Sequence, residues 1–268
     1  MSVMHYVQRG ERNPPIVFVH GFTCDHTDWE AQLAAFAPKH RVVACDLRGH
    51  GKTPGTPETC SIDTFGADVA ALVEELGLND VVLVGHSLGC RVVLQAAQVI
   101  PNRVSGIVLV DGSRLGTGDP EALERSMRAK VEAVGFPTFA AGMFEQMFVP
   151  GATPAAIKTH ILDRAAKMPA AIGAALFPRT PAWDAKNLDR VLATTKQPLL
   201  ALQSTTTNAE GKRVPMAPGL PAPLLDALRA ATPHAQIETI STVGHFTQID
   251  APAWVNEKIA AFIAKAVK

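Results

Sequence analysis

The sequence has no excess of charge of either sign and no long apolar run. Its 268 residues contain 25 acidic and 25 basic side chains, so the formal net charge at pH 7 is zero. A chain without a basic surplus or a basic run is a poor candidate for binding nucleic acid. No stretch approaches the roughly eighteen consecutive apolar residues that indicate a membrane-spanning helix. We therefore expect neither a nucleic-acid partner nor a membrane span.

Cysteines are few and show no pattern. The four (Cys24, Cys45, Cys60 and Cys90) have neither paired spacing nor a nearby histidine at metal-ligand spacing. Residues 1–15 lack a charged segment followed by an apolar one, so we expect no signal peptide. Reduced thiols in a cytoplasmic protein, with no metal site, are the expectation that fits these absences best.

What the sequence does have is an alternation of short apolar runs with amphipathic segments. Residues 62–76 are an example of helical spacing, with Gly77 as the expected end of that helix. This alternation is typical of βαβ units and predicts an α/β fold, with a mostly parallel sheet and helices on both faces. In such sheets the chemistry lies at the carboxyl ends of the strands. Strands are expected at residues 3–7, 16–19, 41–45, 81–84, 104–110, 198–202 and 236–240.

The alternation breaks between residues 115 and 194. This segment carries proline and glycine at short intervals, and it predicts about four short helices with no strand among them. We interpret it as a helical lid inserted into a core domain made of residues 1–114 and 195–268. Its phenylalanine and methionine side chains suit the wall of an apolar pocket, but packing of the lid onto the core explains each of them equally well.

The most informative stretch is residues 81–91, VVLVGHSLGCR. An apolar, β-branched run leads into GHSLG (residues 85–89), and a segment with helical character follows. The pattern G-x-S-x-G between a strand and a helix describes a sharp turn that exposes the serine hydroxyl at the tip of the strand. Glycine on either side allows the close backbone approach that such a turn requires. Ser87 is therefore a candidate nucleophile, which needs a base and an acid partner.

Four motifs stand in order along the chain. They are His20-Gly21-Phe22 at a strand end, the D-x-R-G-H-G turn that begins at Asp46, the GHSLG turn, and Gly244-His245-Phe246. Each is weak alone, but their order and spacing are specific, and together they resemble the α/β-hydrolase fold superfamily over essentially the whole chain. The resemblance implies a serine nucleophile, then an acid, then a histidine along the chain.

The resemblance implies that Ser87 is the nucleophile and His245 the general base, with an oxyanion hole made of the backbone N–H groups of Phe22 and Leu88. Of the nine histidines, His245 alone combines a late position, a preceding glycine and a loop between a strand and a helix. In the superfamily the turn at Asp46 is mostly structural. Packing would explain Phe22 and Trp29 as well as substrate contact does. Predicted substrate-binding residues are Phe22, Trp29, Phe144, Met147, Phe148 and Phe246.

The acid is where the chain departs from the superfamily pattern. Members most often carry it in the loop after the strand expected at 198–202. Here residues 203–211 read QSTTTNAEG, without an aspartate and with Thr207 about where one is expected. Some members take the acid from the end of the preceding strand, where this chain has Asp111. We predict Asp111, and the alternatives are Glu210, which we expect to be solvated, and Asn208 or no acid at all.

These features predict a serine hydrolase that cleaves a carboxylic ester or lactone with apolar groups through an acyl-enzyme, without metal or organic cofactor. Alternatives within the fold are a C–C bond hydrolase, a haloperoxidase-like perhydrolase and a cofactor-free dioxygenase. Haloalkane dehalogenases and epoxide hydrolases fit less well, because their nucleophile is an aspartate where this chain has Ser87. A ligand-binding protein that lost turnover is the alternative outside enzymes. The sequence specifies neither the substrate nor the oligomeric state.

Overall fold

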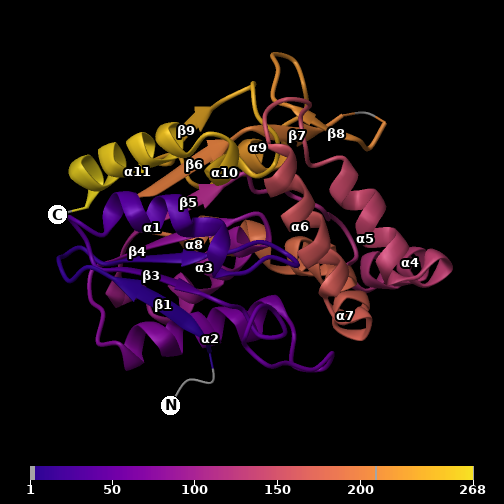
Figure 1. Ribbon diagram of the computed structural model, residues 1–268, viewed down its shortest axis with the longest axis horizontal. Helices are drawn as coiled ribbons and strands as arrows, with labels where there is room; N and C mark the ends of the chain where they lie inside the picture. Colours follow the sequence, from indigo (N-terminus) through magenta and orange to yellow (C-terminus); the bar gives the residue numbers. More distant parts are fainter. Residues whose placement is uncertain (1–3, 209, 268) are drawn as a thin grey trace.

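The computed structural model describes residues 4–208 and 210–267, and it contains a central sheet with helices on both faces (Figure 1). β1 runs antiparallel to β3, and the other neighbouring pairs are parallel. The predicted α/β class, with a mostly parallel sheet, is confirmed. The seven strands lie in the order β1 (Tyr6–Arg9), β3 (Val42–Cys45), β2 (Ile16–Val19), β4 (Val81–His86), β5 (Val104–Val110), β6 (Leu199–Gln203) and β9 (Gln236–Thr239).

The central strands send alternate side chains into two hydrophobic cores. In β4, Val82 and Val84 pack with α1 (Glu30–Phe36) and α11 (Pro252–Ala266), whereas Val81 and Leu83 face the other layer. Because both faces are covered, these strands carry nearly continuous apolar runs rather than an apolar residue at every second position. The other layer consists of α2 (Ile62–Glu75), α3 (Leu88–Val99), α8 (Asp189–Thr194) and α9 (Pro223–Ala231).

The largest departure from the predicted strands lies in residues 203–219, which the sequence indicated to be a loop. Part of this segment forms a separate hairpin of β7 (Thr205–Thr207) and β8 (Arg213–Pro215). A run of threonines suits an extended backbone. The turn is closed by a hydrogen bond of 2.9 Å from the backbone N–H of Asn208 to the carbonyl oxygen of Lys212. At the N-terminus the strand predicted at 3–7 is found at Tyr6–Arg9, and Val3 lies outside the described residues.

Between β5 and β6 the chain is helical, as expected. Figure 1 shows α4 to α7 standing together at the right-hand side of the sheet. α8, the last helix of this inserted segment (residues 115–194), packs against α3 and α9 instead, within a layer that covers the sheet. The inserted elements are α4 (Pro120–Val134), α5 (Phe136–Glu145), α6 (Ala155–Lys167), α7 (Ala170–Trp183), a π-helical turn (Asp184–Leu188) and α8. Short helices elsewhere are His26–Trp29, Pro101–Arg103 and α10 (Thr247–Asp250).

A buried ion pair joins the inserted segment to the core. Arg91 in α3 donates to both carboxylate oxygens of Asp184, at 2.7 and 2.6 Å, and to the carbonyl oxygen of Ser113 at 2.7 Å. Asp184 also accepts a hydrogen bond of 2.7 Å from the backbone N–H of Leu115. The side chains of Arg91 and Asp184 are 3% and 0% exposed, so each charge depends on the other.

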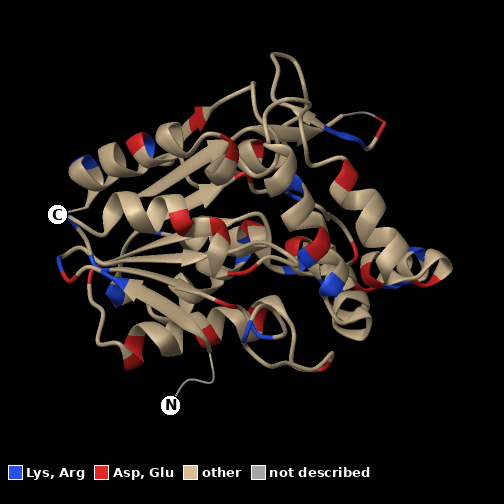
Figure 2. Cartoon of the chain, viewed as in Figure 1, with Lys and Arg blue, Asp and Glu red and all other residues tan. Residues whose placement is uncertain are grey.

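Two arginines of the inserted segment also bind the core. Arg164 in α6 lies 2.6 Å from the buried carboxylate of Asp28, and Arg179 in α7 donates to the carbonyl oxygen of Cys60 at 2.7 Å. Figure 2 shows acidic and basic residues interspersed over the helices in that view, with neither sign gathered on one side. Among the described residues, no helix is both long and apolar enough to cross a lipid bilayer.

We expect Asp184→Ala to lower the free energy of unfolding by about 3–5 kcal/mol, because it leaves the Arg91 guanidinium buried without a counter-ion. The matched control is Asp189→Ala, which removes the partner of Arg114 from a pair whose carboxylate is 67% exposed. That loss should stay within about 1 kcal/mol. Urea unfolding of the two variants measures both values. Equal losses would show that the buried pair has no special role.

Candidate active site

Ser87 lies at the sharp turn between β4 and α3. Its φ and ψ are 53° and −114°, a conformation that side chains rarely adopt and that costs on the order of 1–3 kcal/mol. The turn is tight because a Cβ atom at Gly85 would meet the carbonyl oxygen of Gly89, and one at Gly89 would meet that of Val19. These close approaches hold Ser87 at the tip of the strand and at the N-terminus of α3.

Ser87, His245 and Asp111 form one hydrogen-bonded row. Nε2 of His245 lies 2.8 Å from Oγ of Ser87, and Nδ1 of His245 lies 2.5 Å from Oδ2 of Asp111. The three residues follow β4, β9 and β5 in the structure, so they meet at the carboxyl ends of the strands, as parallel sheets favour. The structure thus places the predicted nucleophile, base and acid within hydrogen-bond distance of one another.

The Asp111 carboxylate is fully buried, and both of its oxygens accept hydrogen bonds. Oδ1 accepts from the backbone N–H groups of Ser204 (2.8 Å) and Thr205 (2.7 Å). Oδ2 accepts from the hydroxyl of Thr205 (2.5 Å), and Nη1 of Arg213 lies 3.5 Å from it. Burial alone would raise the pKa of Asp111, but His245, Arg213 and Thr205 lower it to about 2. The carboxylate is therefore ionised at neutral pH.

The other residues considered for the acid lie elsewhere. Glu210 is exposed in the turn between β7 and β8. The side-chain oxygen of Asn208 accepts the backbone N–H of Lys212 at 2.9 Å. The segment in which the superfamily most often carries the acid instead supplies hydrogen-bond donors to Asp111, from Ser204 and Thr205.

His245 is held in place through its backbone. Its N–H donates to the carbonyl oxygen of Met147 (2.8 Å), and its carbonyl oxygen accepts from Nε2 of His86 (2.8 Å). The preceding carbonyl, that of Gly244, accepts from the hydroxyl of Ser204 at 2.8 Å. These contacts come from β4, from the segment after α5 and from the end of β6. They hold the backbone of His245 so that its imidazole stays beside Ser87.

Burial lowers the pKa of His245, and the charge of Arg213 lowers it further. The Asp111 carboxylate opposes both effects, and the result is a pKa of about 4. The imidazole is therefore neutral at neutral pH, which is the form that can accept a proton.

An apolar cavity of about 580 Å³ opens beside Ser87. Its wall combines core residues with side chains from α4, α5 and α7 of the inserted segment. A cavity of this size and character is typical of sites for small organic molecules. Apolar lining side chains include Phe22, Leu88, Met127, Phe139, Met143 and Phe177.

Of the predicted substrate contacts, Phe22 and Met147 line this cavity. Trp29 does not, and its assignment is corrected: its side chain is fully buried in the core that α1 and α11 cover, 5.0 Å from Phe18 between ring centroids. The sequence shows that Trp29 follows a strand end, but not that its side chain turns to the far face of the sheet.

Phe144, Phe148 and Phe246 also lie away from the lining of the cavity. Phe144 and Phe246 are buried with each other in a small cluster, and the Phe148 ring stacks on that of Phe246 at 5.5 Å. These three side chains pack the inserted segment against the His245 loop, so their role is support. The lining residues of α5 and α7 were among the apolar residues of the predicted lid, but the direction of each side chain depends on helix packing.

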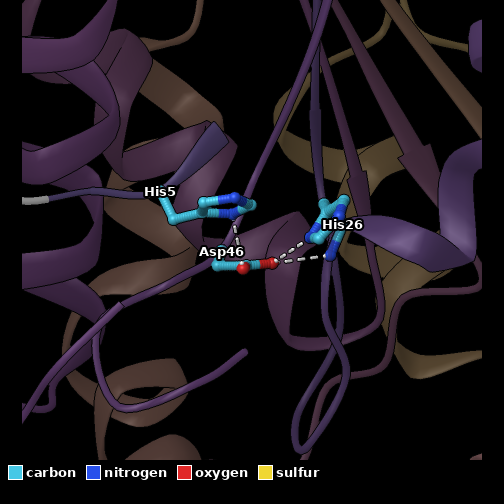
Figure 3. Close-up of side chains that lie close together, drawn as sticks. All are labelled: His5, His26 and Asp46. Atoms are coloured by element: carbon cyan, nitrogen blue, oxygen red, sulfur yellow. Dashed lines mark hydrogen bonds and ion pairs between the residues drawn. The ribbon is translucent and has the colours of Figure 1, made fainter. Parts of the chain in front are cut away.

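A second cluster of polar side chains surrounds Asp46 (Figure 3). His5, His26 and Asp46 have the residue types of a metal site, and their donor atoms lie close together. However, Oδ1 of Asp46 accepts from N–H and Nδ1 of His26 (both 2.8 Å), and Oδ2 accepts from Nδ1 of His5 and N–H of Lys52 (both 2.9 Å). The carboxylate is thus fully used by hydrogen bonds, and the cluster joins the strand end to two loops.

Comparison with known proteins agrees with this fold. A family model described as the Alpha/beta hydrolase family matches residues 16–258. The chain belongs to the alpha/beta hydrolase family. Relatives and structural neighbours of this chain include esterases, lactone-degrading enzymes, epoxide hydrolases and haloperoxidases.

One relative is the dihydrolipoyllysine-residue acetyltransferase component of an acetoin cleaving system from Pseudomonas putida, 28% identical over 265 residues, which are 96% of this chain and 65% of that protein. The matched parts span between 31% and 65% of the length of the first three relatives. A thermophilic esterase from Thermogutta terrifontis superposes with a TM-score of 0.80 at 24% identity, covering 99% of this chain and 94% of that one. An N-acyl homoserine lactone degrading enzyme, Est816, gives 0.79 at 24% identity, with 97% and 96% covered. Both structures show the shared fold.

We expect Asp111→Asn to lower kcat by about three to four orders of magnitude while the fold is kept, since neutralising such an acid removes the control of the imidazole tautomer. Glu210→Gln is the matched control and should stay within about tenfold of the parent, because the exposed carboxylate has little to contribute. Steady-state kinetics on an ester gives both values. The reverse pattern would transfer the role to Glu210.

The lowered pKa of His245 predicts the acid limb of the pH profile. The base acts only when neutral, so a pKa below the ordinary 6.5 keeps it active to lower pH. We expect kcat/KM to be constant from about pH 8 to 6.5 and to decline only in more acidic solution. A half-maximal point at or above 6.5 would contradict this account of the site.

Proposed function

We propose that this alpha/beta hydrolase is a serine hydrolase that cleaves carboxylic esters or lactones with apolar groups through an acyl-enzyme. The observation that carries the proposal is that the row of Ser87, His245 and Asp111 ends beside a largely apolar cavity. A hydroxyl at hydrogen-bond distance from a neutral imidazole, itself oriented by a carboxylate, is the arrangement that activates serine.

In the first step, Oγ of Ser87 attacks the carbonyl carbon of the substrate, and its proton passes to Nε2 of His245. Asp111 keeps Nδ1 protonated and stabilises the imidazolium that forms. The developing oxyanion would be bound by the backbone N–H groups of Leu88 and Phe22. Leu88 is the first residue of α3, where an N–H has no acceptor within the helix. Such donors contribute typically about 3 kcal/mol each to the transition state.

His245 then returns the proton to the leaving alcohol oxygen as the C–O bond breaks. A water molecule repeats the sequence in reverse on the acyl-enzyme: it gives a proton to His245, attacks the acyl carbon and releases the acid and Ser87. With a lactone the alcohol stays attached to the acid, so one product leaves instead of two.

The inserted segment has the role of a lid that sets the choice of substrate. Met127, Phe139, Met143 and Phe177 come from three of its helices and form much of the apolar wall. Methionine side chains adapt to ligands of different shape, which suits an acyl group of moderate length. Esterase and lactone-degrading activities are named for the neighbours that share this fold, and this supports the same pair of substrate classes here.

A cofactor-free dioxygenase is the second candidate, because Asp111 occupies a position that such members of the fold also use. Reactions in which His245 takes a proton directly from the substrate do not require a nucleophilic serine. Loss or retention of turnover without Ser87 therefore separates the two chemistries.

We expect a fluorophosphonate probe to modify Ser87 and Ser87→Ala to abolish ester turnover with little change in stability. The reason is that the probe reacts with a serine whose proton a neighbouring base removes. Mass spectrometry locates the label and thermal unfolding checks the fold. Ser61→Ala is the matched control, because Ser61 lies at the start of α2, remote from Ser87, and this variant should label normally. Ser204→Ala is unsuitable, because the Ser204 hydroxyl supports the His245 loop. Unchanged labelling of the Ser87→Ala protein would refute the assignment.

A further inference from the structure

Arg213 is a cation on the wall of the cavity beside Ser87. It is the first residue of β8, and its side chain is 14% exposed. Its backbone N–H donates to the side chain of Gln146, at the end of α5, so the hairpin closes against the inserted segment (3.3 Å). Arg213 therefore lies where the core, the hairpin and the lid helices meet.

The charge of Arg213 has no counter-ion of its own. Nη1 donates to the hydroxyl of Thr205 at 2.7 Å and lies 3.5 Å from Oδ2 of Asp111. Asp111 is the one carboxylate within 4.0 Å of Arg213 among the described residues. It already accepts three hydrogen bonds from Ser204 and Thr205 and a contact of 2.5 Å from His245, so the carboxylate is shared. A nearly buried charge with a shared partner is costly unless something else pairs with it.

Two of the three nitrogens of the Arg213 guanidinium have no partner among the described residues. Nε and Nη2 of Arg213 make no hydrogen bond with any described residue. Neither nitrogen is fully enclosed by protein atoms, so both can reach a ligand. These two N–H groups form one side of the guanidinium, the fork that matches the two oxygens of a carboxylate.

The rest of the cavity wall supports an anion at this point. Among the described residues, no acidic side chain lines the cavity. The other lining cation, Arg91, is neutralised by Asp184 through two hydrogen bonds. Arg213 is thus the one unbalanced charge that the described wall presents to a ligand.

Resting on the proposed hydrolase function, we propose that Arg213 binds a carboxylate at the far end of the substrate's acyl group, so that the preferred substrates are half-esters of dicarboxylic acids or lactones that carry a free carboxylate. The ester carbonyl would lie at Ser87, the methylene chain along the apolar wall and the free carboxylate on Nε and Nη2 of Arg213. Three successive contacts of 2.8, 2.5 and 3.5 Å link Ser87 through His245 and Asp111 to the guanidinium, so we expect the spacer to be a short chain of methylene groups.

The test compares charged and neutral esters of the same acid. We use the monomethyl and dimethyl esters of glutaric, adipic and suberic acids and measure kcat/KM by methanol release near pH 8, where the imidazole is neutral. Arg213→Gln should lower the monomethyl-to-dimethyl ratio at least tenfold for one or more chain lengths. Any disturbance of Asp111 affects both esters equally and cancels in the ratio.

Lys212→Gln is the matched control. It removes the same charge from the neighbouring position, but Lys212 is exposed and lies outside the cavity lining, so the ratio should not change. A parallel fall for both esters in Arg213→Gln would contradict the proposal and leave the hydrolase function intact. A wild-type protein that prefers the neutral ester at every length would contradict it as well.

Binding measurements separate the proposed role of Arg213 from the proposed hydrolase function. In the Ser87→Ala background, calorimetry with the same esters should show tighter binding of the monomethyl ester, and Arg213→Gln should abolish that preference. If the wild-type protein hydrolyses none of the esters and Ser87 takes no fluorophosphonate label, the proposed function fails, and the calorimetric preference still decides the role of Arg213. No preference in calorimetry refutes it.

Discussion

The site depends on one buried charge, the carboxylate of Asp111. A carboxylate without solvent persists only where hydrogen bonds and opposite charge replace the water it has lost. Here the backbone N–H groups of Ser204 and Thr205 bind one oxygen, and His245 with the Thr205 hydroxyl binds the other. The same interactions fix the direction of the imidazole, which in turn meets Ser87. The end of β6, the end of β5 and the His245 loop are thus fastened to one another through a single group.

The hairpin of β7 and β8 lies at the position in the chain where the superfamily most often carries its acid. In this protein that segment donates hydrogen bonds to the Asp111 carboxylate. Thr205 serves Asp111 through both its N–H and its hydroxyl, and Arg213 returns from β8 to the same carboxylate. Because the hairpin also contacts Gln146 of the inserted segment, the support of the acid and the wall of the cavity belong to one structural unit.

The fold and the positions of Ser87 and His245 could be predicted because local chemistry determines them. A strand that is apolar at every position indicates a sheet covered on both faces, and the glycines around Ser87 indicate a turn that few sequences allow. The substrate contacts could not be predicted in the same way. Trp29 and Phe246 follow strand ends, yet their side chains turn into cores, and that direction depends on packing between distant segments. The hairpin was missed because three threonines in a polar stretch do not distinguish a strand from a loop.

Arg213 connects the recognition of substrate with the chemistry of the base. Its charge is one of the reasons why the pKa of His245 is low in the free protein. A carboxylate bound to the guanidinium would cancel much of that charge, and the imidazole would become more basic in the complex than in the free protein. A general base works best when its pKa lies near the pH of the reaction, so binding the correct acyl group would itself improve the catalyst. A neutral ester of equal size occupies the cavity without raising the pKa of His245. It should therefore differ from the half-ester in turnover as well as in affinity.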